Sequence, residues 1–264
     1  MRRWALRIAA ALTLAYLALL AGLWWAQASL IYPAPQDRHA PAPGFAAVTL
    51  TSEDGLALEA HWRAPDPGRP AVVYFHGNGG SLAGATRETA LLAERGYGVL
   101  LVEYRGYGGN PGAPSEAGLY ADGRAAMAFL AAQGIAPART VVIGHSLGSG
   151  TATEMARQFA PAALILLAPF TTLPDAAAFA MPWVPAELLV RDRYDNRGKL
   201  AGLAMPVLVL HGTADAVVPF TLGKRLAAAG PTATFRAVEG AGHMISLDPQ
   251  VQAAQADWLA GNSL

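Results

Sequence analysis

Residues 144–148, Gly-His-Ser-Leu-Gly, decide how this chain folds, because of the two segments that they join. An apolar, strand-like run over residues 140–143 comes directly before them, and a helical pattern over residues 147–159 begins within them. Glycine two residues before and two residues after a serine permits a tight turn between a strand and a helix, where a Cβ atom would collide with neighbouring backbone. We therefore predict that Ser146 stands on such a turn and acts as a nucleophile.

The alternation of apolar strands and helices continues on both sides of this turn. Strands are expected over residues 48–51, 56–62, 71–75, 99–102, 140–143, 164–167, 207–210 and 234–238. Helices are expected over residues 81–94, 115–132, 147–159, 222–229 and 251–260. The first two strands fit an antiparallel hairpin, whereas most later ones are apolar throughout, as in sheets covered on both faces. The pattern predicts an α/β fold with a mostly parallel sheet of about eight strands flanked by helices.

Residues 170–205 interrupt this alternation. Prolines at positions 174, 182 and 185 break any long helix there, and the segment is too long for a simple loop. We expect it to form a small insertion above the carboxyl edge of the sheet, which we call the cap insertion.

A serine hydroxyl needs a general base, and the base needs an acid that orients it. His243 is the predicted base because it lies in a glycine-rich loop after the last strand, and Asp215 is the predicted acid because it follows the penultimate strand. Asp192 and Asp195 in the cap insertion are alternatives, although an insertion is a poor place to fix an imidazole and Asp195 fits a turn or a helix N-cap. A structural role is expected for the histidines beside the serine and at the end of a buried strand, His145 and His211.

Two backbone amides are candidates for stabilising an oxyanion. The amide of Leu147 follows the predicted nucleophile at the start of a helix. The amide of Asn78 lies in the His-Gly-Asn-Gly-Gly loop at residues 76–80, which lets backbone approach a substrate carbonyl. The alternative, a phosphate-binding loop, is disfavoured because no Gly-Lys-Ser/Thr ending follows. No group of His, Asp and Glu has the spacing of metal ligands, and we expect neither a metal nor another cofactor.

Other side chains near this edge are candidates for substrate contact. The loop after the fourth strand carries Arg105 and Tyr107, which can contact substrate, or Arg105 can pair with a carboxylate and hold the loop. In the cap insertion, Phe179, Met181 and Trp183 are candidates to line an acyl pocket, or they pack the insertion itself.

The composition excludes several classes of protein. The 264 residues are 53% hydrophobic and 14% charged, with a formal net charge of +0 and no cysteine. A chain this apolar is not disordered, and it lacks the basic excess of a nucleic-acid-binding protein. Without cysteine, a covalent catalyst here must use an oxygen or nitrogen nucleophile.

The N-terminal region predicts a membrane anchor. Residues 8–25 carry no charge and follow a basic flank, residues 1–7, which contains three arginines. The positive-inside rule then places the rest of the chain on the non-cytoplasmic, periplasmic side. A signal peptide cleaved after Ala28, which would release the protein, and a buried core helix are alternatives. We expect an anchor over residues 8–27, a proline-rich tether or surface loop over 28–44 and one folded domain over 45–262.

The chain resembles the α/β-hydrolase superfamily over residues 45–262. More narrowly, it is similar to the membrane-anchored group that includes yeast bud-emergence-suppressor-type proteins and the α/β-hydrolase-domain lipases and acyl-protein thioesterases, whose bacterial members are often labelled serine-aminopeptidase-like. The matching stretches are Leu-Ile-Tyr-Pro at 30–33, His-Gly-Asn-Gly-Gly at 76–80, Tyr-Arg-Gly-Tyr-Gly at 104–108, Gly-His-Ser-Leu-Gly at 144–148, Ala-Pro-Phe-Thr-Thr at 168–172, His-Gly-Thr-Ala-Asp at 211–215 and Gly-Ala-Gly-His at 240–243.

This resemblance implies a catalytic triad of Ser146, Asp215 and His243. The implied reaction is the hydrolysis of an ester, thioester or lipid acyl bond through an acyl-enzyme, with a small-molecule or lipid acyl substrate as the partner. Two other functions stay open: a peptide or amide hydrolase, and a catalytically idle scaffold tethered to the membrane.

Overall fold

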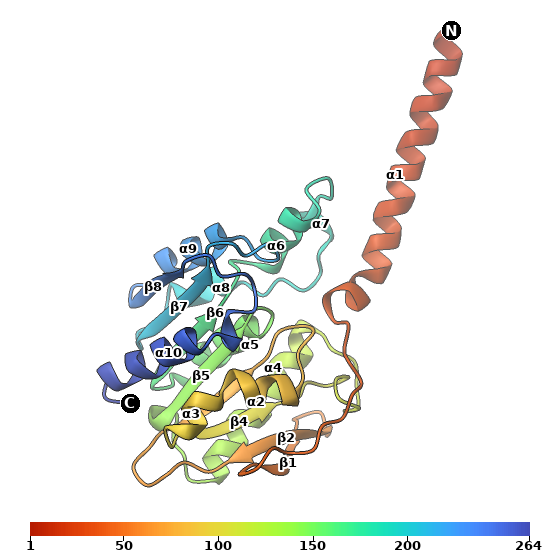
Figure 1. Cartoon of the computed structure of the whole chain (residues 1–264). Coiled ribbons are helices and arrows are strands. Elements are labelled where there is room, and N and C mark those ends of the chain that lie inside the picture. Colours follow the sequence, from red (N-terminus) through yellow and green to blue (C-terminus); the bar gives the residue numbers. More distant parts are fainter.

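The sheet runs through the molecule in the strand order β1-β2-β4-β3-β5-β6-β7-β8 (Figure 1). The computed structural model describes every residue from 1 to 264. The strands are β1 Ala46–Thr51, β2 Ala57–Arg63, β3 Ala71–Phe75, β4 Gly98–Val102, β5 Thr140–His145, β6 Ala163–Leu167, β7 Val207–Gly212 and β8 Ala233–Val238. Strand β2 is antiparallel to β1 and β4, and all other neighbours are parallel. The predicted mostly parallel sheet of eight strands is confirmed.

Helices cover both faces of this sheet. One face packs against α4 Glu116–Ala132, α5 Gly148–Phe159 and α9 Phe220–Ala229, and the other against α2 Leu82–Glu88, α3 Ala90–Glu94 and α10 Pro249–Gly261. Every residue of β3, β4, β5, β6 and β7 is buried. Successive side chains of a strand point to opposite faces, so Val73 belongs to one apolar cluster and Val72 to the other. This is why these strands are apolar throughout.

The helix expected over residues 81–94 is divided into α2 and α3 at Thr89, whose φ of −113° is not helical. The side chain of Gln252 in α10 accepts a hydrogen bond from the amide of Leu91 and donates one to the carbonyl of Arg87. These contacts satisfy backbone groups that the break releases. The partner that stabilises the break, Gln252, lies 161 residues from Leu91 in the sequence, so no local pattern could predict the break.

The cap insertion lies between β6 and β7, as expected. It contains three short helices, α6 Leu173–Ala180, α7 Ala186–Leu189 and α8 Asn196–Leu200. Helix α8 is fixed to the core by an ion pair of 2.9 Å between Lys199 and Glu154 of α5. Glu154 also pairs with Arg157 at 2.5 Å. Although burial alone would raise its pKa, these partners lower the pKa of Glu154 from 4.5 to about 2.

Replacing Glu154 with glutamine should therefore destabilise the protein at neutral pH by roughly 2 kcal/mol. A lowered pKa stabilises the folded state above pH 4.5, and this contribution is lost as the pH falls toward about 2. Chemical unfolding at several pH values should show a smaller decline with acid for Glu154→Gln than for the natural protein. Glu94→Gln, at an exposed position on α3, is the control and should unfold like the natural chain. Equal acid sensitivity of both variants would contradict the prediction.

A single long helix, α1 Arg2–Ile31, contains the predicted anchor. It is long and apolar enough to cross a membrane, and Figure 1 shows it projecting from the domain on the side where α6 and α7 lie. The following segment is extended and lies on the domain: the amide of Gly108 donates to the carbonyl of Pro35 at 2.8 Å, and the Tyr32 hydroxyl donates to Asp192 at 2.5 Å. The tether or surface loop is expected over residues 28–44, but residues 28–31 continue α1, and residues 32–44 have the form of a surface loop.

Candidate active site

Ser146 occupies a strained turn between β5 and α5. Its φ is +51°, in the left-handed region that residues with a Cβ rarely adopt, and its amide donates to the carbonyl of Leu167 at 2.9 Å. A Cβ added at Gly144 would lie 2.4 Å from the carbonyl oxygen of Gly148, and one added at Gly148 would lie 2.0 Å from that of Phe75. Any side chain at either position would collide with backbone oxygen atoms, so both positions require glycine, as the spacing of the motif predicts.

The structure brings Ser146, His243 and Asp215 together in one line of hydrogen bonds. Nε2 of His243 lies 2.9 Å from the Ser146 hydroxyl, and Nδ1 lies 2.8 Å from Oδ2 of Asp215. The three residues come from the β5–α5 turn and from the loops after β7 and β8, which all lie at the carboxyl edge of the sheet. A base within hydrogen-bond distance of a hydroxyl can remove its proton during nucleophilic attack.

Three hydrogen-bond donors surround the carboxylate of Asp215. Oδ1 accepts from the amides of Val217 and Val218 at 2.8 and 2.9 Å, and Oδ2 accepts from His243. Nε2 of His211, which is hydrogen-bonded to the carbonyl of Val218, lies 3.2 Å from Oδ2. Burial alone would raise the pKa of Asp215, but these donors outweigh it and hold the pKa well below its usual value. The carboxylate is thus ionised and fixed in place.

His145 supports the loop that carries His243. Its ring is buried, which lowers its pKa and keeps it neutral, and its Nε2 lies 3.1 Å from the carbonyl oxygen of His243. His145 thus has a structural role, as expected: its ring contacts the backbone of His243, the candidate base. His211 likewise contacts the candidate acid.

The two amides predicted to stabilise an oxyanion border the same cavity as Ser146. Neither the Leu147 amide nor the Asn78 amide donates a hydrogen bond within the protein. The loop of Asn78 lies against the predicted nucleophile, since a Cβ added at Gly77 would be 3.4 Å from Cβ of Ser146. Two free donors beside a nucleophile can stabilise negative charge on a carbonyl oxygen.

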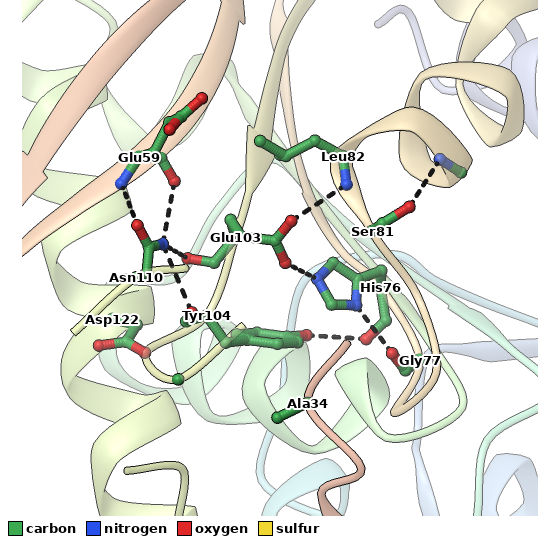
Figure 2. A network of polar contacts seen from close by, with 12 residues as sticks. Ala34, Glu59, His76, Gly77, Ser81, Leu82, Glu103, Tyr104, Asn110 and Asp122 are labelled. Atoms are coloured by element: carbon green, nitrogen blue, oxygen red, sulfur yellow. Dashed lines mark hydrogen bonds and ion pairs between the residues drawn. The ribbon is translucent and has the colours of Figure 1, made fainter. Parts of the chain in front are cut away.

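A buried ion pair beneath this loop, absent from the sequence predictions, connects His76 to Glu103 (Figure 2). Nε2 of His76 lies 2.9 Å from Oε1 of Glu103, and Nδ1 lies 2.7 Å from the carbonyl oxygen of Gly77. Both ring nitrogens face acceptors, so the imidazolium form satisfies both. Burial alone would lower the pKa of His76, but Glu103 and Gly77 more than offset it and raise the pKa above its usual value.

Replacing Glu103 with glutamine should lower the pKa of His76 and, at a pH where His76 is charged, lower the free energy of unfolding by roughly 1.5–3 kcal/mol. A raised pKa stabilises the fold below the unfolded pKa, and that contribution is lost as the pH rises through the folded pKa. An NMR titration of the histidine ring nitrogens should give a higher pKa for His76 in the natural chain than in Glu103→Gln. Glu59→Gln, which alters a half-exposed carboxylate on β2, should leave the pKa of His76 unchanged. Equal pKa values of His76 in the natural chain and in Glu103→Gln would contradict the prediction.

The cavity next to Ser146 has a volume of about 240 Å³, and 17 of its 20 lining residues are hydrophobic. Its walls come from the cap insertion, from the loops at the sheet edge and, unexpectedly, from α1. The lining side chains from α1 are Leu23, Trp24, Gln27, Leu30 and Ile31. This wall could not be predicted from the sequence, because nothing in an apolar helix indicates which of its residues touch the domain.

Of the five side chains considered for substrate contact, only Met181 lines this cavity. Phe179 and Trp183 are 53% and 49% exposed on the outside of the cap insertion. The structure corrects the prediction for Tyr107, which is fully buried and packs against the ring of His76. Arg105 does not reach the cavity either: it pairs with Asp122 and Asp54, the alternative role considered for it.

The two rival acids lie elsewhere. The side chain of Asp195 accepts from the amide of Gly198 and forms the N-cap of α8, as expected for that position. Asp192 accepts from Tyr32.

Comparison with known proteins identifies the fold. A family model described as the alpha/beta hydrolase fold matches residues 70–190. An uncharacterized protein of Mycobacterium tuberculosis is 40% identical over 231 residues, which cover 84% of this chain and 82% of that protein. The lysophosphatidylserine lipase ABHD12 of Danio rerio is 33% identical over 195 residues, 66% of this chain and 51% of the lipase. A solved esterase of Pyrococcus furiosus, 18% identical, superposes with a TM-score of 0.71 over 88% of this chain and 97% of its own.

Proposed function

Because this chain belongs to the α/β-hydrolase family, we propose that it hydrolyses carboxylic esters of lipids through an acyl-enzyme on Ser146. The observation that carries this proposal is the line of hydrogen bonds from Asp215 through His243 to Ser146, which ends at an apolar cavity. A nucleophile, a base and an orienting acid are what acyl transfer to water requires.

In the first step, His243 removes the hydroxyl proton of Ser146 while Oγ of Ser146 attacks the ester carbonyl carbon. The amides of Leu147 and Asn78 stabilise the oxyanion of the tetrahedral intermediate. His243 then passes the proton to the leaving alcohol, whose bond to the acyl carbon breaks. The ionised carboxylate of Asp215 accepts a hydrogen bond from Nδ1 of His243, which keeps the proton on that nitrogen and stabilises the imidazolium.

In the second step, water takes the place of the alcohol. His243 removes a proton from the water as it attacks the acyl carbon, and then returns that proton to Ser146. The acyl bond to Ser146 breaks, and the carboxylic acid leaves with the free enzyme restored.

The lining of the cavity favours a long acyl chain over an aminoacyl group. Its polar residues are Gln27, Asn78 and Ser146, and no Asp or Glu lines it, so nothing there would bind the amino group of an aminopeptidase substrate. One relative acts on a lysophospholipid, lysophosphatidylserine. We therefore propose the acyl ester of a lipid as the substrate class.

We also propose that α1 spans the membrane uncleaved, with its basic N-terminal flank in the cytoplasm. Three arginines lie within residues 1–7, and the apolar run follows them directly. The positive-inside rule then places the catalytic domain on the opposite side of the membrane.

A series of substrates tests the proposed activity. The full chain in detergent is given p-nitrophenyl esters from acetate to longer acyl chains, lysophospholipids, and aminoacyl p-nitroanilides. We expect kcat/KM to rise by about fourfold for each methylene that enters the cavity, and we expect no turnover of the anilides. Faster hydrolysis of the anilides would make the protein an amide hydrolase, and no turnover of any ester would support the idle scaffold.

A further inference from the structure

Helix α1 contacts the cap insertion at several heights along its axis. The hydroxyl of Tyr16 donates to the carbonyl of Trp183 at 2.8 Å, and the guanidinium of Arg191 lies 4.9 Å from the ring centre of Trp24. Gln27 donates to the carbonyl of Leu189 and accepts from the amide of Arg191. Because Tyr16 and Gln27 are eleven residues apart, the cap insertion follows α1 for about 16 Å. Figure 1 shows α6 and α7 on the side of the domain from which α1 projects.

These contacts set the depth of the cap insertion in a membrane. Tyr16 lies nine positions before Trp25, the end of the uncharged run. If α1 spans the bilayer as proposed, Tyr16 therefore lies about 13 Å inside that end, in a hydrocarbon core about 30 Å thick. Trp183, whose carbonyl it binds, then lies at the depth of the acyl chains of one leaflet.

The tip of the cap insertion has the composition that this depth requires. Residues 176–186 contain no charged side chain, and Phe179 and Trp183 point outward, about half exposed. Charged residues return at Glu187 and Arg191. Arg191 lies at the height of Trp24 and Gln27, where lipid headgroups would begin. Exposed aromatic side chains of this kind mark a surface that lipid or another partner covers.

An unpaired N–H group is costly in lipid, and within residues 176–186 the amide of Trp183 is the one outside α6 that donates to no group in the protein. Pro182 and Pro185 have no N–H group. The amides of Met181, Val184 and Ala186 all donate within the insertion. The Trp183 carbonyl, which would otherwise lack a donor, is bonded to Tyr16.

The cavity next to Ser146 lies between these two membrane-facing elements. Leu23, Trp24, Leu30 and Ile31 form its wall on α1, which we call the α1 wall, and Met181 and Val184 line it from the cap insertion. An acyl chain can thus pass between α1 and the cap insertion from the bilayer to Ser146 without crossing water.

We infer that the cap insertion is immersed in the non-cytoplasmic leaflet beside α1, and that the enzyme takes the acyl chain of a membrane-resident amphiphile directly from that leaflet along the α1 wall. This inference rests on the proposed function and specifies its substrate as a lipid still embedded in the bilayer. The anchor is then part of the substrate site.

Depth measurements test the immersion without any need for catalysis. The chain contains no cysteine, so Trp183→Cys and Phe179→Cys each provide one site for an environment-sensitive fluorophore. In phosphatidylcholine vesicles we expect both labels to be quenched by lipids that carry a nitroxide midway along the acyl chain. A label at Ala131→Cys, exposed at the end of α4, should stay unquenched. Labels at positions 179 and 183 that report water in the vesicles would overturn the inference.

Two substrates test the route. Leu23→Trp places a larger side chain in the α1 wall and so narrows the cavity. Leu19→Trp adds the same ring one helical turn away, where the side chain does not line the cavity. With the protein in vesicles, we expect Leu23→Trp to lower hydrolysis of a long-chain lysophospholipid at least tenfold and that of p-nitrophenyl butyrate less than twofold, and Leu19→Trp to change neither. Equal effects of the two variants on the lipid would overturn the route. A natural chain that cleaves neither substrate would instead overturn the proposed function.

Discussion

Ser146→Ala should lower kcat for any ester by about 10⁵- to 10⁶-fold, the range expected when the nucleophile of a coupled triad is lost. The hydroxyl of Ser146 is the protein group that is hydrogen-bonded to Nε2 of His243, so the variant leaves this base without a hydroxyl to activate. A fluorophosphonate probe forms a stable bond only with an activated serine, so the natural chain should be labelled and the variant should not.

Ser149 provides a matched control for this experiment. It lies three residues further along the chain, in α5, is fully buried and accepts a hydrogen bond from Asn196. Ser149→Ala should lose some stability but keep its labelling. Equal labelling of the natural chain and the Ser146→Ala variant would show that the probe reacts elsewhere and would remove Ser146 as the nucleophile.

Asp215→Asn should lower kcat by about 10⁴-fold while the protein stays folded. The three groups hydrogen-bonded to this carboxylate are all donors, and two of them are backbone amides that cannot change. The amide group of asparagine should therefore turn its oxygen toward Val217 and Val218 and its NH₂ group toward His243. His243 must then carry its proton on Nε2, which leaves it unable to accept the proton of Ser146.

The control for this variant is Asp195→Asn, because asparagine is as good an N-cap as aspartate. It should leave the rate unchanged and so separates the two aspartates that the sequence offers as acids. The test compares kcat for a soluble ester and chemical unfolding of each variant. A larger loss of rate in Asp195→Asn than in Asp215→Asn would assign the acid to the cap insertion.

The sheet and the grouping of Ser146, Asp215 and His243 were predictable from sequence because each depends on local signals. Uninterrupted apolar runs mark buried strands, and the glycines around Ser146 reflect collisions with atoms close by in the fold. The carboxyl ends of parallel strands share one edge, so loops distant in sequence are expected to meet there. Roles that follow from topology can thus be read from order and spacing.

Roles that depend on the partner of a side chain could not be predicted. His76 and Glu103 are 27 residues apart, and no pattern in either segment shows that the two face each other. Tyr107 stands in a loop at the correct edge but turns into the core, a choice made by packing against His76. The side of α1 that meets the cap insertion could not be predicted either, because apolar residues lie on all sides of this helix.

The left-handed backbone of Ser146 means that this fold is less stable with serine at this position than it would be with glycine. A residue with a Cβ in this conformation costs the folded state about 1–2 kcal/mol, and glycine does not bear that cost. Selection for stability alone would place glycine at position 146, and the proposed role of Ser146 as the nucleophile accounts for the serine there.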